Sequence, residues 1–324
     1  MTPERAGILA PACAVALAAV GVWGCWRVFV RSARGQVFEE FALRGSRIGA
    51  WRLDDQASAL LDMVSTPALV LAMLLVVILG AIRGQWVSGV AAAAAVAGAN
   101  ISTQVLKAWV FDRPEFPGDG VAVSGNSLPS GHTTVAASVM FALVLVIPPA
   151  LRALMAWLGV GVITAFGFAT LVNQWHRPSD TVAAVLVVTA WASAAVFVIR
   201  LVAWAGGRPM VRSRPGVAFV VLLLLAVIAL GIAGFCGYVT WNADLASATR
   251  TTQFAAYAGG AALLGAATFA GLGMVLAMLQ SAKPDPAQVE RSRDTRLTNT
   301  SSMLASTGDA DTRPNPASRN LEAN

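Results

Sequence analysis

Residues 126–134 read Asn-Ser-Leu-Pro-Ser-Gly-His-Thr-Thr, and an apolar run follows them directly. Pro129 ends an extended loop, and Ser130 is a residue type that favours the N-cap of a helix. Gly131 and His132 then fall in the first helical turn, where backbone N–H groups have no partner inside the helix. These donors and the helix dipole favour an anion. The stretch therefore predicts an anion-binding helix mouth beside His132.

The composition places this helix in a membrane protein. The 324 residues are 56% apolar and only 12% charged, which is too apolar for a soluble domain of this length. A helix of about 17 to 25 apolar residues crosses a bilayer. We expect an all-α polytopic bundle of about eight transmembrane helices, at Ile8–Trp26, Val64–Ile82, Trp86–Leu106, Thr133–Ile147, Leu154–Val172, Thr181–Ile199, Val217–Thr240 and Phe254–Leu279. The fourth window is short and the fifth carries polar residues, so counts of seven and nine stay open. The first window is long for a signal peptide and is expected to remain as an anchor.

The chain divides into three parts by composition. Residues 1–205 hold six of the spans, residues 206–280 hold two additional membrane helices, and residues 281–324 form a polar tail. The tail is rich in Ser, Thr, Asp and Pro, which is typical of disorder. Within the first part, residues 27–63 form a polar loop of mixed charge. The end of this loop, Leu53–Met63, is compatible with an interfacial helix or with a solvated segment.

Polar residues gather at the end of the third predicted span. Asn100, Gln104 and Lys107 recur at positions i, i+4 and i+7, so they share one helix face, which we expect to look into the bundle. Polar groups inside a membrane are costly unless they meet partners or water, so this face indicates function. The prolines and glycine of residues 112–118 end the helix, which leaves Arg113 free to turn back towards Lys107.

The second of the two histidines, His176, lies in the loop before the sixth predicted span. Pro178 suits the first position of that helix, and Asp180 in its first turn can reach back to an imidazole nitrogen. With eight spans, parity puts this loop on the same side of the membrane as the His132 loop. The segment Arg200–Pro215 is basic and has no acid, so the positive-inside rule makes it cytoplasmic. We therefore expect a multi-pass protein of the cell membrane with both histidines outside and a cytoplasmic tail.

Three segments of the chain resemble the signature motifs of the type 2 phosphatidic acid phosphatase superfamily, in its membrane-bound lipid phosphate phosphatase branch: Lys107 with Arg113-Pro114, then Pro129-Ser130-Gly131-His132, then His176 with Asp180. The resemblance covers about residues 86–199 and implies a six-helix phosphatase core formed by the first six spans. It also implies a hydrolase that releases inorganic phosphate from a lipid phosphate monoester or diphosphate, with a phosphorylated lipid as its partner. No cofactor is implied. Nucleic acid is not expected as a partner, because the arginines form no basic face interleaved with aromatic residues.

Phosphate chemistry accounts for the residue types at the helix mouths. A phosphate monoester is a dianion, so attack on it needs positive charge and N–H donors around its oxygens. Lys107 and Arg113 are expected to supply the charge. Ser130 and Gly131 are expected to supply the directed donors.

The two histidines and the aspartate account for the catalytic steps. A neutral imidazole approaches an anion more easily than a carboxylate does, so His176 is the expected nucleophile, which forms a phosphohistidine. Asp180 is expected to fix the tautomer of His176 and to stabilise the cation that forms. His132 is expected to protonate the departing alkoxide and then to activate water. The resemblance implies the same roles.

The chain departs from the family pattern at two places. One residue fewer than usual separates Lys107 from Arg113, a difference that a loop absorbs. The third motif normally opens with Ser-Arg, whereas Ala169 and Thr170 stand at these positions. One phosphate-binding cation is therefore missing. We expect Thr170 to donate a hydrogen bond instead, and Arg177, next to the nucleophile, to supply positive charge from another direction.

Two alternatives of different class stay open. A lipid-linked phosphotransferase would pass phosphate to an alcohol, and a phosphorylated product formed with an added acceptor would identify it. A non-catalytic membrane scaffold of the same fold is the second alternative, because one cation is missing. A failure to release phosphate from any lipid phosphate would favour it. A metal site is not expected, because no further ligands cluster with the two histidines and Asp180.

Overall fold

The computed structural model describes residues 3–48, 50, 53–116, 121, 125–206, 216–244 and 248–280. No β-strand occurs in these ranges, and the all-α prediction is confirmed. The elements are α1 (Pro3–Cys25), the π-helix η1 (Trp26–Val30), α2 (Ala33–Ser46), α3 (Asp54–Asp62), α4 (Thr66–Ile82), α5 (Trp86–Val105), the π-helix η3 (Leu106–Val110), α6 (Gly131–Val146), the 3-10 helix η4 (Pro149–Leu151), α7 (Arg152–Val172), α8 (Pro178–Ala205), α9 (Val217–Thr240) and α10 (Arg250–Gln280).

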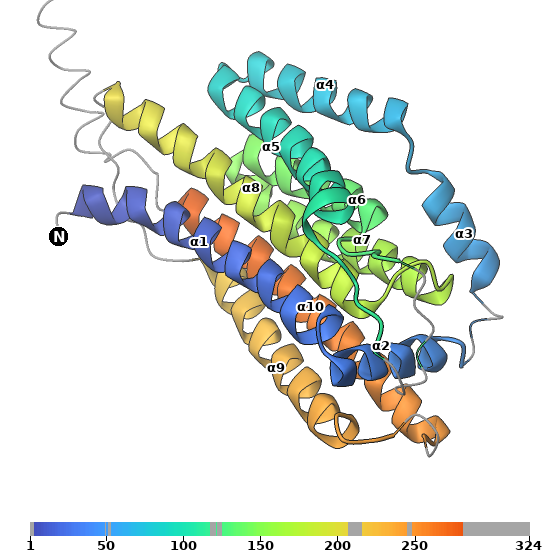
Figure 1. Cartoon of the computed structure of the whole chain (residues 1–324). Coiled ribbons are helices and arrows are strands. Elements are labelled where there is room, and N and C mark those ends of the chain that lie inside the picture. The colour runs from blue at the N-terminus through green and yellow to red at the C-terminus, as the bar shows by residue number, and fades with distance from the viewer. Residues whose placement is uncertain are drawn as a thin grey trace, which may run out of the picture.

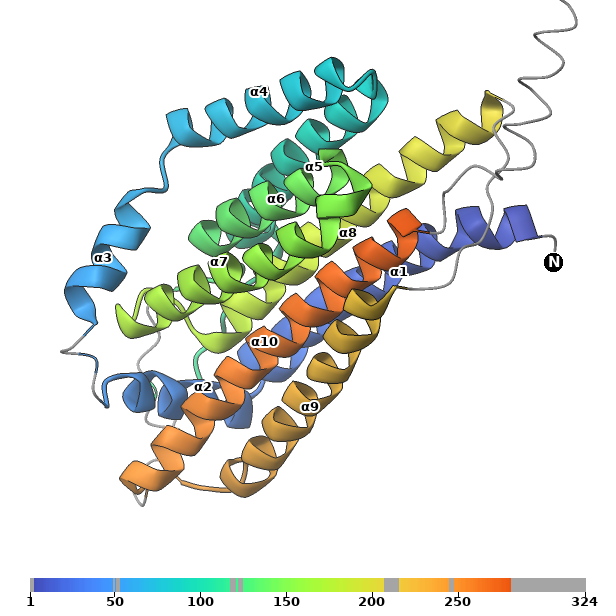
Figure 2. The same cartoon turned by 180° about the vertical axis from the view of Figure 1, so that it is seen from behind.

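The long helices lie alongside one another in a single bundle (Figure 1). Helix α8 is central and contacts α1, α5, α6 and α10. Helix α9 packs on α10 at the outside of the bundle, as the view from behind shows (Figure 2). Helix α2 lies across one end of the bundle and contacts α10, α7 and α8. Helix α2 precedes the segment that resembles the phosphatase superfamily, and it therefore covers the end of the bundle at which α8 begins.

Six of the described helical segments are long and apolar enough to cross a membrane: Leu9–Val30, Trp86–Val110, Pro149–Val172, Pro178–Ala205, Val217–Thr240 and Arg250–Leu279. Helices α3 and α4 pass the same test only as a pair bent by 61°, and α6 is a shorter apolar helix. Each of the eight predicted windows falls on a helix. Leu223, Val227 and Phe235 of α9 are exposed, as suits a lipid-facing helix. The helices agree with a multi-pass membrane protein.

Sequence signals account for the starts of several helices. The Ser32 hydroxyl oxygen accepts the Gly35 N–H at 3.0 Å and caps α2, and Ser65 caps α4 in the same way. Ser130 caps α6, and Pro178 occupies the first turn of α8, as their residue types predict. The segment Leu53–Met63 contains α3.

Small residues let α10 approach the bundle closely. A Cβ atom on Gly260 would lie 2.5 Å from the Pro178 side chain, and one on Gly167 of α7 would lie 2.4 Å from Leu264. Only glycine fits at such distances, and helices of membrane proteins use small residues in this way. Helix α10, from outside the expected six-span core, therefore packs directly against the start of α8.

The basic segment that we used to orient the chain is only partly described. Arg200 lies inside α8, buried, and its guanidinium donates to the Met278 carbonyl oxygen of α10. Residues 207–215 and the predicted tail at 281–324 lie outside the described residues. The cytoplasmic placement of both stays a prediction.

Candidate active site

The two predicted helix mouths meet at one end of the bundle. Helix α6 begins at Gly131 after its cap, Ser130, whose hydroxyl oxygen accepts the Thr133 N–H at 3.4 Å. The Ser130 N–H donates to the backbone oxygen of Asp180 at 2.9 Å. This bond joins the start of α6 to the first turn of α8. The Ser-Gly-His stretch and the His176 loop therefore lie side by side, although more than forty residues separate them in the chain.

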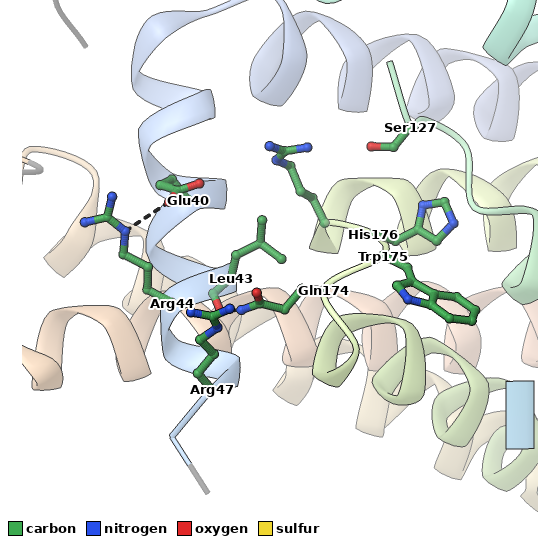
Figure 3. Close-up of a pocket in the computed structure, with 9 residues that line it drawn as sticks. Glu40, Leu43, Arg44, Arg47, Ser127, Gln174, Trp175 and His176 are labelled. Atoms are coloured by element: carbon green, nitrogen blue, oxygen red, sulfur yellow. Dashed lines mark hydrogen bonds and ion pairs between the residues drawn. The ribbon is translucent and has the colours of Figure 1, made fainter. Parts of the chain in front are cut away.

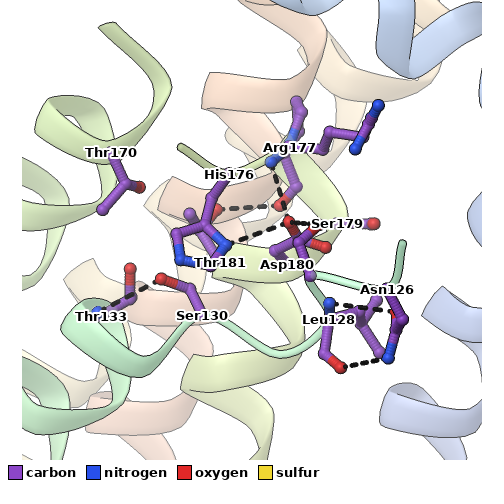
Figure 4. Close-up of polar contacts among 12 residues, drawn as sticks. Asn126, Leu128, Ser130, Thr133, Thr170, His176, Arg177, Ser179, Asp180 and Thr181 are labelled. Atoms are coloured by element: carbon purple, nitrogen blue, oxygen red, sulfur yellow. Dashed lines mark hydrogen bonds and ion pairs between the residues drawn. The ribbon is translucent and has the colours of Figure 1, made fainter. Parts of the chain in front are cut away.

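His176 is held by a buried carboxylate. Its Nδ1 lies 3.2 Å from Oδ2 of Asp180, which has no exposed surface. The same oxygen accepts the Ser127 hydroxyl at 2.7 Å and the Arg177 N–H at 2.9 Å (Figure 4). An ionised carboxylate only accepts hydrogen bonds, so neutral His176 carries its hydrogen on Nδ1 and a lone pair on Nε2. In Figure 4 the Nε2 side of the ring points away from Asp180, towards Ser130 and Thr170.

The other imidazole lies beside the first. His132, in the first turn of α6, is half-buried, and its ring centroid is 5.3 Å from that of Trp175, the neighbour of His176. It is close enough to His176 and to Lys107 to interact with both electrostatically. The structure thus brings His132, His176 and Lys107 to the same end of the bundle.

Lys107 lies at the end of the third predicted span. It lies in η3, half-buried, and interacts electrostatically with Asp180. The Asn126 amide nitrogen donates to the carbonyl oxygen of Lys107 at 3.2 Å and to that of Phe111 at 3.1 Å, which ties the loop before α6 to this turn.

The predicted polar face of this span meets α6. Asn100 donates to the Ser138 hydroxyl of α6 at 3.1 Å. The Gln104 side chain is exposed, but its amide nitrogen lies beside Gly131 at the mouth of α6. Thr103 shares this face, and its hydroxyl lies 3.0 Å from that of Thr134.

Arg113 pairs with a carboxylate of α2, whereas its turn towards Lys107 stays a prediction. Its Nη2 lies 3.2 Å from Oε2 of Glu39 in α2, and both side chains are fully buried. A buried guanidinium needs an opposite charge, and Glu39 supplies it. The Nε and Nη1 atoms of Arg113 are buried and have no hydrogen-bond partner among the described residues. Two N–H-bearing groups of this cation thus have hydrogen-bonding capacity that no described residue uses.

Glu39 bridges two parts of the site. Its Oε1 accepts the Ser179 N–H of α8 at 3.2 Å, while its Oε2 holds Arg113. Burial and then the charge of Asp180 raise the pKa of Glu39 from its ordinary 4.5 to about 7, although Arg113 opposes the shift. Sequence reasoning placed Glu39 in a solvated loop. Its helical spacing from the apolar Ala42 and from Gln36, both buried, was the signal that could have identified it.

The remaining predicted phosphate ligands are placed differently from one another. The Thr170 hydroxyl donates to the Gly167 carbonyl oxygen at 2.8 Å, so its hydrogen is directed into α7. The Thr170 carbonyl oxygen accepts the N–H groups of Trp175 and His176 at 3.1 and 3.3 Å, which shapes the histidine loop. Gly131 is half-buried at the mouth of α6. Arg177 is buried, and its Nε has no hydrogen-bond partner among the described residues.

A cavity of about 400 Å³ opens beside His176. Figure 3 shows His176 and Trp175 on one side of it and the side chains of α2 on the other. The residues that line it are Glu40, Leu43, Arg44, Arg47, Ser127, Gln174, Trp175, His176 and Arg177. Three of them are arginines and one is a glutamate, which pairs with Arg44 at 3.0 Å. The surplus of positive charge favours an anionic ligand. Sequence reasoning identified neither this wall of α2 nor Ser127.

Helix α2 also fixes the loop that carries His176. Gln174 has a positive φ of 58°, an uncommon conformation for a residue other than glycine. The side-chain amide nitrogen of Gln174 donates to the Leu43 carbonyl oxygen at 3.0 Å. The Ser46 hydroxyl donates to the Leu171 carbonyl oxygen at 3.0 Å. The surrounding contacts thus hold the loop in a backbone conformation that it would not adopt alone.

Replacement of Arg177 by alanine tests whether this side chain supplies the missing positive charge. The backbone N–H to Asp180 survives the change, so the effect isolates the guanidinium. We expect Arg177→Ala to lower turnover as severely as Arg113→Ala, by roughly 10²-fold, the usual cost of losing one donor to a developing charge. The exposed Arg34, which pairs with Asp244 at the surface, provides the control, and Arg34→Ala should retain the wild-type rate. A nearly normal rate for Arg177→Ala would remove the side chain from the site.

No group of three or more His, Cys, Asp and Glu side chains that could hold a metal ion occurs in the described ranges. The buried side-chain atoms of the site that lack a hydrogen-bond partner among the described residues lie on Arg113, Arg177, Thr133, Ser179 and Asp180. The two arginines offer N–H donors, which suit the oxygens of a phosphate.

The sequence of residues 88–204 matches the family model of the PAP2 superfamily. The matched segment contains Lys107, Arg113, the Ser130-Gly131-His132 stretch, His176 and Asp180, and it excludes α2 with Glu39. No curated protein and no solved structure matches the chain.

Proposed function

We propose, from the premise that residues 88–204 belong to the PAP2 superfamily, that this protein is an integral membrane phosphatase that hydrolyses a phosphorylated lipid. Membership implies phosphatase-type activity on phosphate esters, and the apolar helices agree with a membrane setting. The finer proposal is that the ester is a lipid phosphate monoester or diphosphate and that the phosphoryl group passes through His176.

The buried pair of His176 and Asp180 carries this proposal. The 3.2 Å contact leaves Nε2 of His176 as the nucleophilic atom. This nitrogen attacks phosphorus as the bond to the leaving alkoxide breaks, and His132 gives the alkoxide a proton. Water then releases inorganic phosphate from the phosphohistidine. Lys107, Arg113 and the mouth of α6 stabilise the negative charge on the phosphoryl oxygens.

The cavity beside His176 supports a large polar substrate. It holds more than one phosphate-sized group, and its arginines suit an anionic headgroup. Leu43 and Trp175 give its lining an apolar part beside the charged one.

Phosphate release from a panel of lipids tests the function. We expect the purified protein in detergent, without added metal, to release inorganic phosphate from at least one of phosphatidic acid, phosphatidylglycerol phosphate and a polyprenyl diphosphate. The same preparation should release phosphate more slowly from a water-soluble phosphate ester of equal concentration. If the folded protein is inactive on every lipid, the non-catalytic alternative gains. If release is equal for soluble and lipid esters, the lipid part of the proposal fails.

A further inference from the structure

Glu39 lies outside the segment that the family model matches, and its carboxylate contacts two elements of the proposed phosphate site. One oxygen takes Nη2 of Arg113 at 3.2 Å, and the other takes the N–H of Ser179 at 3.2 Å. Arg113 lies in the loop after η3, whereas Ser179 lies in the first turn of α8, next to Asp180. One side chain of α2 thus fixes the relative position of a cation and of the turn that carries the catalytic carboxylate.

We propose that Glu39 is a positioning residue, which holds the Arg113 guanidinium and the first turn of α8 in the arrangement that binds the phosphate of the substrate. This inference rests on the proposed function, because it concerns the same phosphate site.

Because both carboxylate oxygens accept a hydrogen bond, Glu39 must be ionised to make both contacts. Each oxygen faces an N–H donor, so an ionised carboxylate satisfies both contacts. A glutamine at this position has one oxygen and one NH2 group, so one of the two donors would face another donor. When Glu39 is protonated, one of its oxygens carries a hydrogen, so one of the two N–H donors would again face a donor. The positioning therefore needs the negative charge as well as the length of the side chain.

Burial of this charge has an energetic cost, which argues against a merely structural role. The pKa of Glu39 rises from 4.5 to about 7, with burial as the largest cause. Between these two values the folded protein binds more protons than the unfolded chain, so this group lowers stability as the pH rises from 4.5 to about 7. A carboxylate that costs stability in its ionised form, beside a catalytic group, is typical of a functional site.

The neighbours of Glu39 limit what else could produce its pH dependence. The titratable and charged groups that face it in the described ranges are Arg113, then Arg177 and Asp180 of α8, then Cys25 of α1. Tyr257 of α10 packs further along α2, at Gly45. His176 is connected to Glu39 through Asp180, with which it shares a hydrogen bond.

Tungstate binding tests the proposal without catalysis, because tungstate is a tetrahedral dianion. We expect Glu39→Gln to weaken tungstate binding, measured by calorimetry at pH 8, by about tenfold or more. Glu115→Gln removes an exposed carboxylate from the segment that carries Arg113, and it should bind tungstate like the wild type. Stronger binding to Glu39→Gln would mean that the carboxylate only repels the anion, and would overturn the proposal.

A double-mutant cycle separates positioning from general damage to the fold. If Glu39 acts through Arg113 and the first turn of α8, the loss of tungstate affinity in Glu39→Gln/Arg113→Gln should be smaller than the product of the two single losses. Independent, multiplying losses would contradict the proposal. The double variant should also melt at a higher temperature than Glu39→Gln, because it no longer buries an unpaired guanidinium.

The pH profile gives the third readout. As the pH falls from 8 to 6, wild-type Glu39 takes up a proton and loses one of its contacts. The ratio of the two tungstate dissociation constants, Glu39→Gln over wild type, should therefore fall towards one. The ratio cancels the pH dependence of the other groups, which both proteins share. A constant ratio would rule out the ionised carboxylate as the positioning group. Normal tungstate binding in a wild type that releases no phosphate would instead contradict the proposed function alone.

Discussion

Phosphate release by the His176→Ala variant is expected to fall on the order of 10⁴-fold or more, because the variant lacks the atom that forms the covalent intermediate. The variant should still bind tungstate, since Arg113, Lys107 and the mouth of α6 keep their contacts. The measurement is inorganic phosphate released from the best lipid of the panel, with tungstate affinity as the check on the fold. A His176→Ala variant that retains substantial activity would exclude the phosphohistidine.

His132→Ala should separate the two halves of the same reaction. With p-nitrophenyl phosphate, whose leaving group needs no proton, this variant should release about one equivalent of nitrophenol rapidly and then stall, because water is no longer activated. The stalled protein should carry an acid-labile phosphate. A slow linear release without a burst would mean that His132 does not act in the second step.

Asp180→Asn is expected to produce the second largest loss, about 10³- to 10⁴-fold in turnover, similar to the loss of the orienting carboxylate in other His-dependent sites. Oδ2 of Asp180 accepts from Nδ1 of His176, the Ser127 hydroxyl and the Arg177 N–H. The side chain of asparagine has only one oxygen that can accept hydrogen bonds from these three donors. It can equally present its NH2 group to the imidazole, which would hold the wrong tautomer, with the hydrogen on Nε2.

Ser127→Ala provides the matched control for this carboxylate. It removes one donor to Oδ2 but leaves the two that involve His176 and Arg177, so its loss of turnover should be much smaller, about tenfold or less. The comparison uses turnover of the saturated enzyme, because orientation of the nucleophile acts on the chemical step. Equal losses in Asp180→Asn and Ser127→Ala would mean that the network acts as a whole and that Asp180 has no special part in setting the tautomer.

Local sequence signals were sufficient for the helices of the eight apolar windows and for the mouths of α6 and α8, but not for α2, which lies in the predicted polar loop. The apolar windows, Ser130 before α6 and Pro178 at the start of α8 are properties of a few neighbouring residues. Because caps and apolar runs act over one or two turns, they can be recognised without the fold. The reach of Asp180 to His176 is equally local, since four residues separate them.

Contacts between distant segments could not be predicted in the same way. The ion pair of Arg113 with Glu39 joins residues 74 positions apart in the chain, and no local pattern predicts it. The contact of the Thr103 hydroxyl with Thr134 of α6 was equally absent from the predicted polar face of α5. The hydroxyl of Thr170 is directed to Gly167 by the geometry of α7.

The sequence by itself determined that this chain forms apolar helices long enough to cross a membrane, and it predicted which residues act on phosphate, because apolar length, helix caps and residue types are local properties. Only the tertiary structure decided that α2 crosses the end of the bundle, neutralises Arg113 through Glu39 and lines the cavity beside His176. The physical reason is the cost of burying charge. A guanidinium inside the protein requires a counter-charge, and which carboxylate supplies it depends on how the helices pack.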